Sequence, residues 1–216
     1  MIQYKIATTV TEKESAISLV KGVYVREGYL KSASDDVASI SDYINLPEAV
    51  TVLAQEGDFL GGTITMVLDS SGGLPMDIIY RAELSEFRSG GHKLAEVCQF
   101  AVDWDLHDDG ASKHSNPEVS LGLLSHVIHS AIRCDVTHLC FTINPKHAGF
   151  YQSMGCVQIG GEKEYPLVNS APALAFMLDL KAIVGSINEG VMPKFSLIKK
   201  MYDFKPAESF FDKLSN

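Results

Sequence analysis

The stretch INPKHAGFYQSMGC, residues 143–156, decides how the middle of the chain folds. It follows the apolar run LCFT at 139–142, which is typical of a buried strand. Pro145 has no N–H to donate to a sheet and keeps Asn144 out of helical geometry, so the strand must end here. A short helix that carries Tyr151 would follow. The stretch therefore predicts a strand that ends beside a helix N-terminus, a place where ligands commonly bind.

The segments before this stretch complete a strand–helix–strand crossover. The run LAEVCQFAV at 94–102 has the composition of a strand, and Asn116-Pro117 would begin a helix that runs to about Arg133. Two strands joined in this way are expected to be parallel. Outside this unit the pattern predicts a helix over 11–30 capped by Thr11 and Glu14, a hairpin of strands 50–54 and 62–68, a short helix over 79–88, and two strands within 156–180.

This order of elements predicts a mixed α+β domain in α/β/α layers. A Rossmann domain is excluded because no GxGxxG opens a helix after the first strand. The chain has 216 residues and 46% apolar residues, which is enough for one large core. We place this domain at 1–185 and expect 186–216 to form a partly helical extension packed on it.

Composition and charge exclude several classes of function. The net charge is 18 − 27 = −9, which argues against a nucleic-acid partner. The four cysteines form no CxxC pair, the N-terminus has no signal-peptide pattern, and no apolar segment is long enough to span a bilayer. We therefore expect a cytoplasmic protein with buried thiols. His126 and His129 lack a third ligand at suitable spacing, and the acidic run 103–109 lacks a calcium-loop register, so no metal site is predicted.

Glu96 is the most informative residue of strand 94–102. Strict alternation gives one face of this strand the side chains of Leu94, Glu96, Cys98, Phe100 and Val102. Burying a lone carboxylate is costly, so Glu96 must be paired, linked to water or protonated at neutral pH. A carboxylate in such surroundings can act as a general base. The alternative is a structural ion pair with Arg88 or His92.

Tyr151 has two interpretations of the same kind. A phenol has an ordinary pKa of about 10, above the value of about 8.5 for a thiol, so it can protonate a departing thiolate. Alternatively, Phe150 and Tyr151 are a packing pair. The residues alone leave both interpretations open.

The strand–helix–strand unit followed by NPxHxxFYxxxG resembles the GCN5-related N-acetyltransferases (GNAT). The resemblance implies that strands 94–102 and 139–143 are adjacent, parallel and splayed, that an acyl thioester lies in the opening, and that Tyr151 is the acid. Members of this family that use acetyl-CoA carry an (R/Q)xxGx(G/A) loop that binds pyrophosphate. The corresponding segment here, 103–116, is acidic and contains only Gly110.

A narrower resemblance is to the long-chain N-acyl amino acid synthases of the FeeM type, which are similar to the acyl-homoserine lactone (autoinducer) synthases. It is carried by the segments VYVREGYL (23–30), GTITMVLDSSGGLPMDIIYRAEL (62–84), GGHKLAEVCQFAV (90–102), NPKHAGFYQSMGC (144–156) and VNSAPALAFMLDL (168–180). It implies an acyltransferase that moves a fatty acyl group to the amine of an amino acid. The expected donor is the acyl-phosphopantetheine of acyl carrier protein, with acyl-CoA as the alternative, and no cofactor is tightly bound. Gln99 replaces an arginine of the autoinducer synthases, which argues against homoserine-lactone chemistry.

The resemblance also implies roles for individual residues. Glu96 would be the base, Tyr151 the acid, and backbone N–H groups near a bulge in Val97, Cys98, Gln99 and Phe100 would hold the oxyanion. Asn144 and His147 would contact a substrate, with a surface role as the alternative for His147. The acceptor's carboxylate needs a cation or donor, and the nearest candidates in the sequence are Arg81, Arg88, His92 and Lys93. The rival functions are a CoA-dependent GNAT that acetylates a small amine, an autoinducer-synthase-like protein, and a non-catalytic acyl-binding module.

Overall fold

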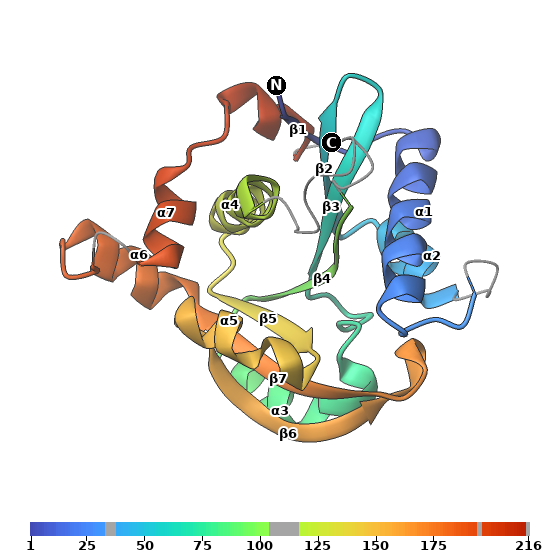
Figure 1. Cartoon of the computed structure of the whole chain (residues 1–216). Coiled ribbons are helices and arrows are strands. Elements are labelled where there is room, and N and C mark those ends of the chain that lie inside the picture. Colours follow the sequence, from blue (N-terminus) through green and yellow to red (C-terminus); the bar gives the residue numbers. More distant parts are fainter. Residues whose placement is uncertain (33–37, 104–116, 194–195, 215–216) are drawn as a thin grey trace.

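The computed structural model describes residues 1–32, 38–103, 117–193 and 196–214 and contains a seven-stranded mixed sheet in the order β1-β2-β3-β4-β5-β7-β6 (Figure 1). β4 and β5 are parallel, and the other paired strands are antiparallel. The strands are β1 (Gln3–Ile6), β2 (Ala49–Glu56), β3 (Phe59–Leu68), β4 (Leu94–Val102), β5 (His138–Ile143), β6 (Val157–Tyr165) and β7 (Ala171–Asp179).

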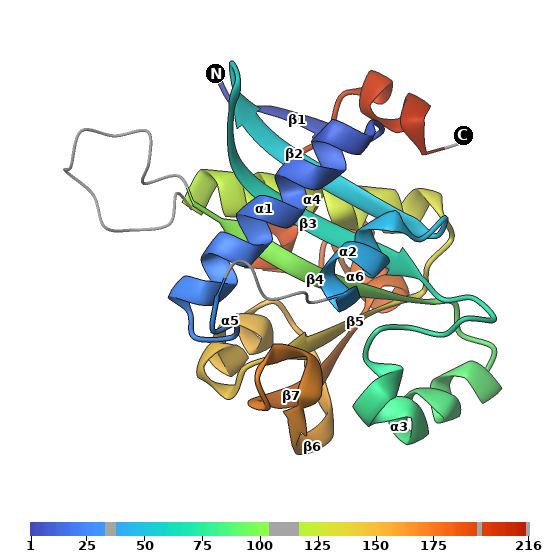
Figure 2. The same ribbon diagram turned by 90° about the vertical axis from the view of Figure 1, so that its right-hand side faces the viewer.

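Helices cover both faces of this sheet. α4 lies on one face, while α1 and α2 lie on the other (Figure 1), and α1 crosses β3 and β4 (Figure 2). The helices are α1 (Val10–Arg26), α2 (Ala38–Asn45), α3 (Asp77–Ser89), α4 (Pro117–Arg133), α5 (Ala148–Ser153), α6 (Leu180–Asn188) and α7 (Leu197–Asp203), with 3₁₀ turns η2 (Pro145–His147), η3 (Pro166–Val168) and η4 (Glu208–Lys213). None of these helices combines the length and the apolar character that crossing a bilayer requires.

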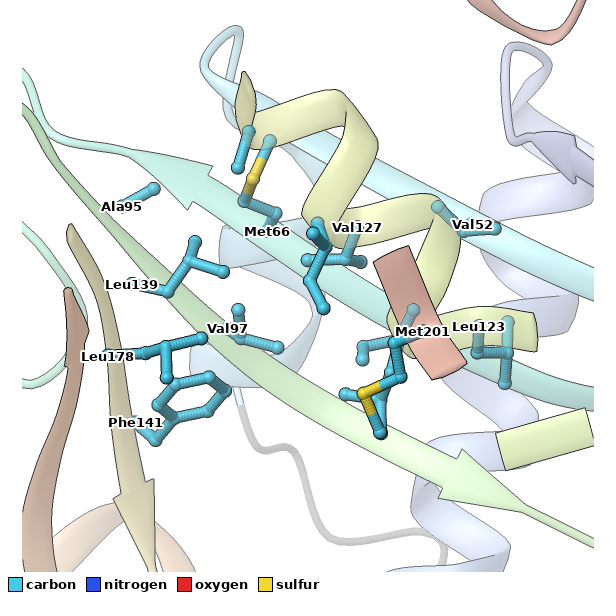
Figure 3. Packing of buried hydrophobic residues seen from close by; sticks show 14 of the residues in the cluster. Val52, Met66, Ala95, Val97, Leu123, Val127, Leu139, Phe141, Leu178 and Met201 are labelled. Carbon is cyan, nitrogen blue, oxygen red and sulfur yellow. The ribbon is translucent and has the colours of Figure 1, made fainter. Parts of the chain in front are cut away.

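The largest core cluster lies between α4 and the sheet. Leu123 and Val127 of α4 pack with strand residues such as Met66, Val97 and Leu139 (Figure 3), and all of them are almost fully buried. The C-terminal segment extends this cluster through the side chains of Ile198, Met201, Phe210 and Phe211. Ser125 fixes that segment to α4 by donating to the carbonyl oxygens of Met201 and Phe204, each at 2.6 Å.

Several predictions from the sequence are confirmed. β2 and β3 form the predicted hairpin, and β4 has the predicted bounds, 94–102. β4, α4 and β5 form the predicted crossover with parallel strands. The mixed α+β fold class is therefore correct.

The first helix differs from its prediction at both ends. α1 begins at Val10 and ends at Arg26, and its capping box consists of Thr9 and Glu12 rather than Thr11 and Glu14. Both pairs fit the S/T-x-x-E pattern, so spacing alone does not choose between them. β1 and α2 were not predicted at all, and α3 begins two residues earlier than expected.

The predicted alternation of β4 is wrong beyond Cys98. Gln99 has a φ of +53°. Between the paired positions Cys98–Thr65 and Ala101–Thr63, β4 contains one residue more than β3, which is a β-bulge. The side chains therefore change faces: Phe100 and Val102 pack with the α4 cluster, while Ala101 packs against α1. Leu94, Glu96 and Cys98 keep the predicted face.

We predict that Gly122→Ala destabilises the fold. Gly122 lies inside α4, and a Cβ there would overlap the phenol of Tyr4, whose ring is stacked on His126. Overpacking of this kind typically costs about 1–3 kcal/mol, which exceeds the gain of about 1 kcal/mol from replacing a helical glycine. The free energy of unfolding in urea measures this difference.

The matched control is Gly22→Ala, inside the equally long helix α1. No atom lies within 4 Å of a Cβ at this position, so only the gain in helix propensity remains. Gly22→Ala should stabilise the protein by up to about 1 kcal/mol. Equal effects of the two substitutions would contradict the close packing of α4 against β1.

Candidate functional site

The sheet opens between its two parallel strands. β4 and β5 are paired over four positions, from Leu94–His138 to Val97–Phe141, and no further partners follow in these two strands. β4 then bulges at Gln99, while β5 continues to Ile143 as a partner of β7 alone. Beyond Val97, the backbone of β4 is therefore not paired with β5 at the edge that faces the opening.

Glu96 is buried immediately before this opening. Its side chain is 1% exposed, and its two oxygens accept hydrogen bonds from the Met76 N–H at 2.7 Å and the Thr142 hydroxyl at 3.2 Å. The structure contradicts the alternative that Arg88 or His92 forms an ion pair with it. The pKa of Glu96 rises to about 8, mainly because burial penalises the ionised form, and the charge of Asp77 adds to this effect. A carboxylate with such a pKa can exchange a proton near neutral pH, as a general base requires.

Tyrosines from three elements lie within electrostatic range of this carboxylate. They are Tyr24 of α1, Tyr43 of α2 and Tyr165 at the end of β6. Burial raises the pKa of each phenol, to about 12 for Tyr43, and the negative charge of Glu96 raises it further. These phenols are therefore neutral groups that can donate hydrogen bonds close to Glu96. The sequence did not reveal them, because they lie far from Glu96 in the chain and belong to no common motif.

Cys98 and Gln99 complete the wall that β4 contributes. Cys98 follows Glu96 on the same face, and burial, with a smaller effect from the charge of Glu96, raises the pKa of its thiol. Gln99 is 5% exposed and sits at the bulge. Val97 and Phe100 direct their side chains into the α4 cluster instead, so only their backbone is available to the opening.

Tyr151 lies on α5, just beyond the end of β5. Its ring packs against Phe141 and Phe150, with ring centroids 5.0 and 5.4 Å apart. Burial raises the pKa of this phenol above its ordinary value, so it holds its proton throughout the physiological range. Burial raises the pKa of Tyr24 as well, and the charges of Tyr151 and Glu96 add to this effect. Phe150 and Tyr151 form the packing pair that the sequence left open, and proton donation by Tyr151 stays a prediction.

The other predicted site residues lie in different surroundings. The side-chain oxygen of Asn144 accepts from the Lys146 N–H at 3.1 Å and caps η2, and His147 is exposed at the start of α5. Arg88 binds two carboxylates, and His92 lies against Phe87 and His138 at the start of β4. The structure thus places Glu96, Cys98 and Gln99 in β4 beside the point where β4 and β5 part, and Tyr151 on α5 beyond the end of β5. The guanidinium of Arg88 is bound by Asp69 and Asp77 instead.

Two sequence features bear on cofactors and metals. The segment 104–116, which was predicted to lack a pyrophosphate-binding loop, lies outside the described residues. His126 and His129 hydrogen-bond the carbonyl oxygens of Gly122 and Tyr202, at 2.7 and 2.9 Å. Within the described ranges no three His, Cys, Asp or Glu side chains form a group that would hold a metal ion.

Comparison with known proteins identifies the family. The family model of the N-acyl amino acid synthase FeeM matches residues 15–179. The solved structure of FeeM, from uncultured soil microbes, is similar over 84% of this chain and 93% of its own, with 35% identity and a TM-score of 0.75. No curated protein matches the chain.

More distant structures share the fold. An N-acetyltransferase from Staphylococcus aureus Mu50 is 15% identical, with a TM-score of 0.55 over 84% of this chain and 99% of its own. MesI, a CoA-dependent acyl-homoserine lactone synthase, is also 15% identical, with a TM-score of 0.56 over 95% and 97%. The resemblance inferred from the sequence is confirmed: the chain belongs to the FeeM family of N-acyl amino acid synthases, and it is an acyltransferase with the GNAT fold.

Proposed function

We propose that the chain transfers a long-chain fatty acyl group from the thioester of acyl carrier protein to the amine of an amino acid. The observation that carries this proposal is the buried Glu96, whose pKa of about 8 suits a base beside the opening between β4 and β5. An amino acid at neutral pH presents an ammonium group, which cannot attack a carbonyl until it loses a proton. A carboxylate with a raised pKa is the group this step needs.

The reaction follows from the groups at the opening. Glu96 removes a proton from the ammonium, and the freed nitrogen attacks the thioester carbonyl to form the C–N bond. Backbone N–H groups of β4 at the bulge stabilise the oxyanion. The C–S bond then breaks, and Tyr151 gives its proton to the departing thiolate. The nitrogen loses its remaining extra proton, which returns to Tyr151 through solvent, and Glu96 releases to solvent the proton that it accepted. The products are an N-acyl amino acid and the free thiol.

One sequence feature supports acyl carrier protein as the donor. The phosphopantetheine of a carrier protein has one phosphate, so no pyrophosphate loop is needed, and the acidic segment 103–116 with its single glycine suits that requirement. The match to the family of N-acyl amino acid synthases supports an amino acid as the acceptor. The direct test compares lipid extracts of cells that express this chain or its Glu96→Gln variant. N-acyl amino acids should accumulate only with the unaltered chain.

We predict that Glu96→Gln lowers turnover by about 10²–10⁴-fold, the usual contribution of a positioned general base. An amide keeps an oxygen for the Met76 N–H, so circular dichroism should show a folded protein. In the unaltered enzyme kcat/KM should rise with pH through about 8, because the base must be ionised. The pH profile of the variant should lack this rise near pH 8. Its turnover should recover partly at high pH, where more of the amine is already deprotonated.

The control for this substitution is Glu164→Gln, which changes an exposed carboxylate on β6. Its pH profile should match that of the unaltered enzyme. A folded Glu96→Gln protein with normal turnover would show that Glu96 is not the base, and the assignment would then pass to His147 or to water.

We predict that Tyr151→Phe slows transfer from a pantetheine thioester by about 10²-fold or more, because the thiolate leaves without a proton. An aryl thioester, whose thiolate is a weak base, should react at nearly the same rate with both proteins. Tyr202→Phe, on α7 beside His129, is the control and should change neither rate. An equal loss with both thioesters would mean that Tyr151 acts by packing.

We predict a higher kcat/KM for acyl carrier protein than for CoA at equal acyl-chain length. Acyl-pantetheine, which lacks both the carrier and the nucleotide, gives the reference rate. A clear preference for CoA would refute the carrier-protein donor and favour a CoA-dependent N-acyltransferase.

A further inference from the structure

Arg88 is held between two carboxylates that flank the loop before α3. Its Nε and Nη2 donate to Asp69 at 2.7 and 2.9 Å, and its Nη1 and Nη2 donate to Asp77, both at 2.7 Å. The three side chains are 28%, 15% and 7% exposed. Two donors on each carboxylate fix the orientation of that carboxylate as well as its distance from Arg88. The planar guanidinium is the side-chain group that can bind carboxylates in this way.

A break in α3 makes this contact possible. Residues 77 and 88 of a straight helix would be about 16 Å apart along its axis, too far for one arginine to span. Tyr80 has non-helical angles, with φ −122° and ψ 23°, so the segment that follows turns back toward Asp77. The Tyr80 hydroxyl fixes the break by hydrogen-bonding the carbonyl oxygens of Gly161 and Ala173, at 2.8 and 2.7 Å.

The turn between these two carboxylates holds the predicted base. The N–H of Asp69 donates to the Leu94 carbonyl at the start of β4, at 3.0 Å. At the other end, the Leu74 N–H donates to Asp77 at 2.7 Å, and Asp77 follows directly after Met76. The Met76 N–H is the 2.7 Å donor to Glu96.

Gly73 lets this turn close. Its φ is +78°, and a Cβ there would lie 2.6 Å from the Asp77 carboxylate. A side chain at this position would therefore displace Asp77 from the Leu74 N–H. Oδ2 of Asp77 accepts from both the Leu74 N–H and Arg88 Nη2, and Oδ1 accepts from Arg88 Nη1, so the loop and the guanidinium bind this carboxylate at the same time.

We propose that Arg88 is a positioning residue for Glu96: by binding Asp69 and Asp77 at once, it fixes the turn whose Met76 N–H orients the Glu96 carboxylate. This inference rests on the proposed role of Glu96 as the base. It replaces the expectation that Arg88 holds the carboxylate of the acceptor, since its donors are already bound.

The charges around Glu96 set the sign of the effect. Among the residues that the structure describes, the ionisable groups that interact electrostatically with Glu96 are Asp77, Cys98, Cys140, Tyr24, Tyr43 and Tyr165, and the Thr142 hydroxyl donates a hydrogen bond to it. Of these, Asp77 is the carboxylate, and Arg88 compensates its charge. Arg88→Gln would leave Asp77 uncompensated and loosen the Met76 N–H. Both changes raise the pKa of Glu96.

The decisive measurement needs no substrate. Protein labelled with ¹³C in its glutamate carboxyl groups is titrated by NMR, with Glu96→Gln to assign the Glu96 signal. Arg88→Gln should move this titration to higher pH and remove the low-field shift of the Met76 amide proton. Arg88→Lys keeps the positive charge but cannot donate paired hydrogen bonds to each carboxylate. It should therefore change the Glu96 titration and the Met76 amide shift in the same direction, by smaller amounts. If Arg88→Gln does not fold, Arg88→Lys decides.

Kinetics then connect the geometry to the reaction. Arg88→Gln should lower kcat/KM by up to about 10²-fold, as a misplacement of about 1 Å can do, with the pH profile shifted to higher pH. Lys181→Gln removes an exposed charge on α6 and is the control that should change neither property. An unchanged Glu96 titration and Met76 amide in folded Arg88 variants overturns the inference and leaves the proposed function standing. Absence of transferase activity in the unaltered chain would refute the function, while the titration would still test the positioning.

Discussion

A carboxylate taken out of water must either find partners or give up its charge, and Glu96 is the place in this fold where that constraint acts. Its hydrogen-bond donors are one backbone N–H and one hydroxyl, and the Arg88 guanidinium binds two other carboxylates. These neutral donors compensate only part of the cost of burial, so the proton is held until about pH 8. The incomplete compensation is what keeps the pKa of this carboxyl group within the range of physiological pH.

The surrounding sheet is built around that residue. β4 is the central strand: it is antiparallel to β3 along its length and parallel to β5 for only four pairs. The bulge at Gln99 comes just after the two parallel strands part, so the regular pairing of β4 is interrupted beside the opening. α1 carries Tyr24 and α5 carries Tyr151, and burial together with the charges of Tyr151 and Glu96 raises the pKa of the Tyr24 phenol.

The sequence predicted those parts of the fold that depend on local pattern. Strand β4 and the end of β5 at Asn144 follow from alternation and from the chemistry of proline, and both are as expected. Glu96 could be recognised because a charge within an apolar strand is conspicuous. The strand–helix–strand order predicted that β4 and β5 are parallel, and the family resemblance added that they are adjacent.

What was missed depends on contacts or on backbone angles without a signature. The positive φ of Gln99 is unmarked because the residue is not glycine, so the alternation was carried too far along β4. The break in α3 at Tyr80 contains neither proline nor glycine, and it is held by carbonyl groups more than 80 residues away. Without that break, no sequence argument could bring Arg88 to Asp77.

The raised pKa of Glu96 also ties the stability of the fold to pH. In the unfolded chain this carboxyl titrates near its ordinary value of about 4.3. Between that pH and about 8 the folded protein therefore holds a proton that the unfolded chain has released. By thermodynamic linkage, the contribution of Glu96 to stability is greatest below this window and is lost progressively as the pH rises through it. The chain is thus least favoured to fold in the conditions that make its carboxylate ready to accept a proton, and an ammonium group bound beside Glu96 would return part of that stability.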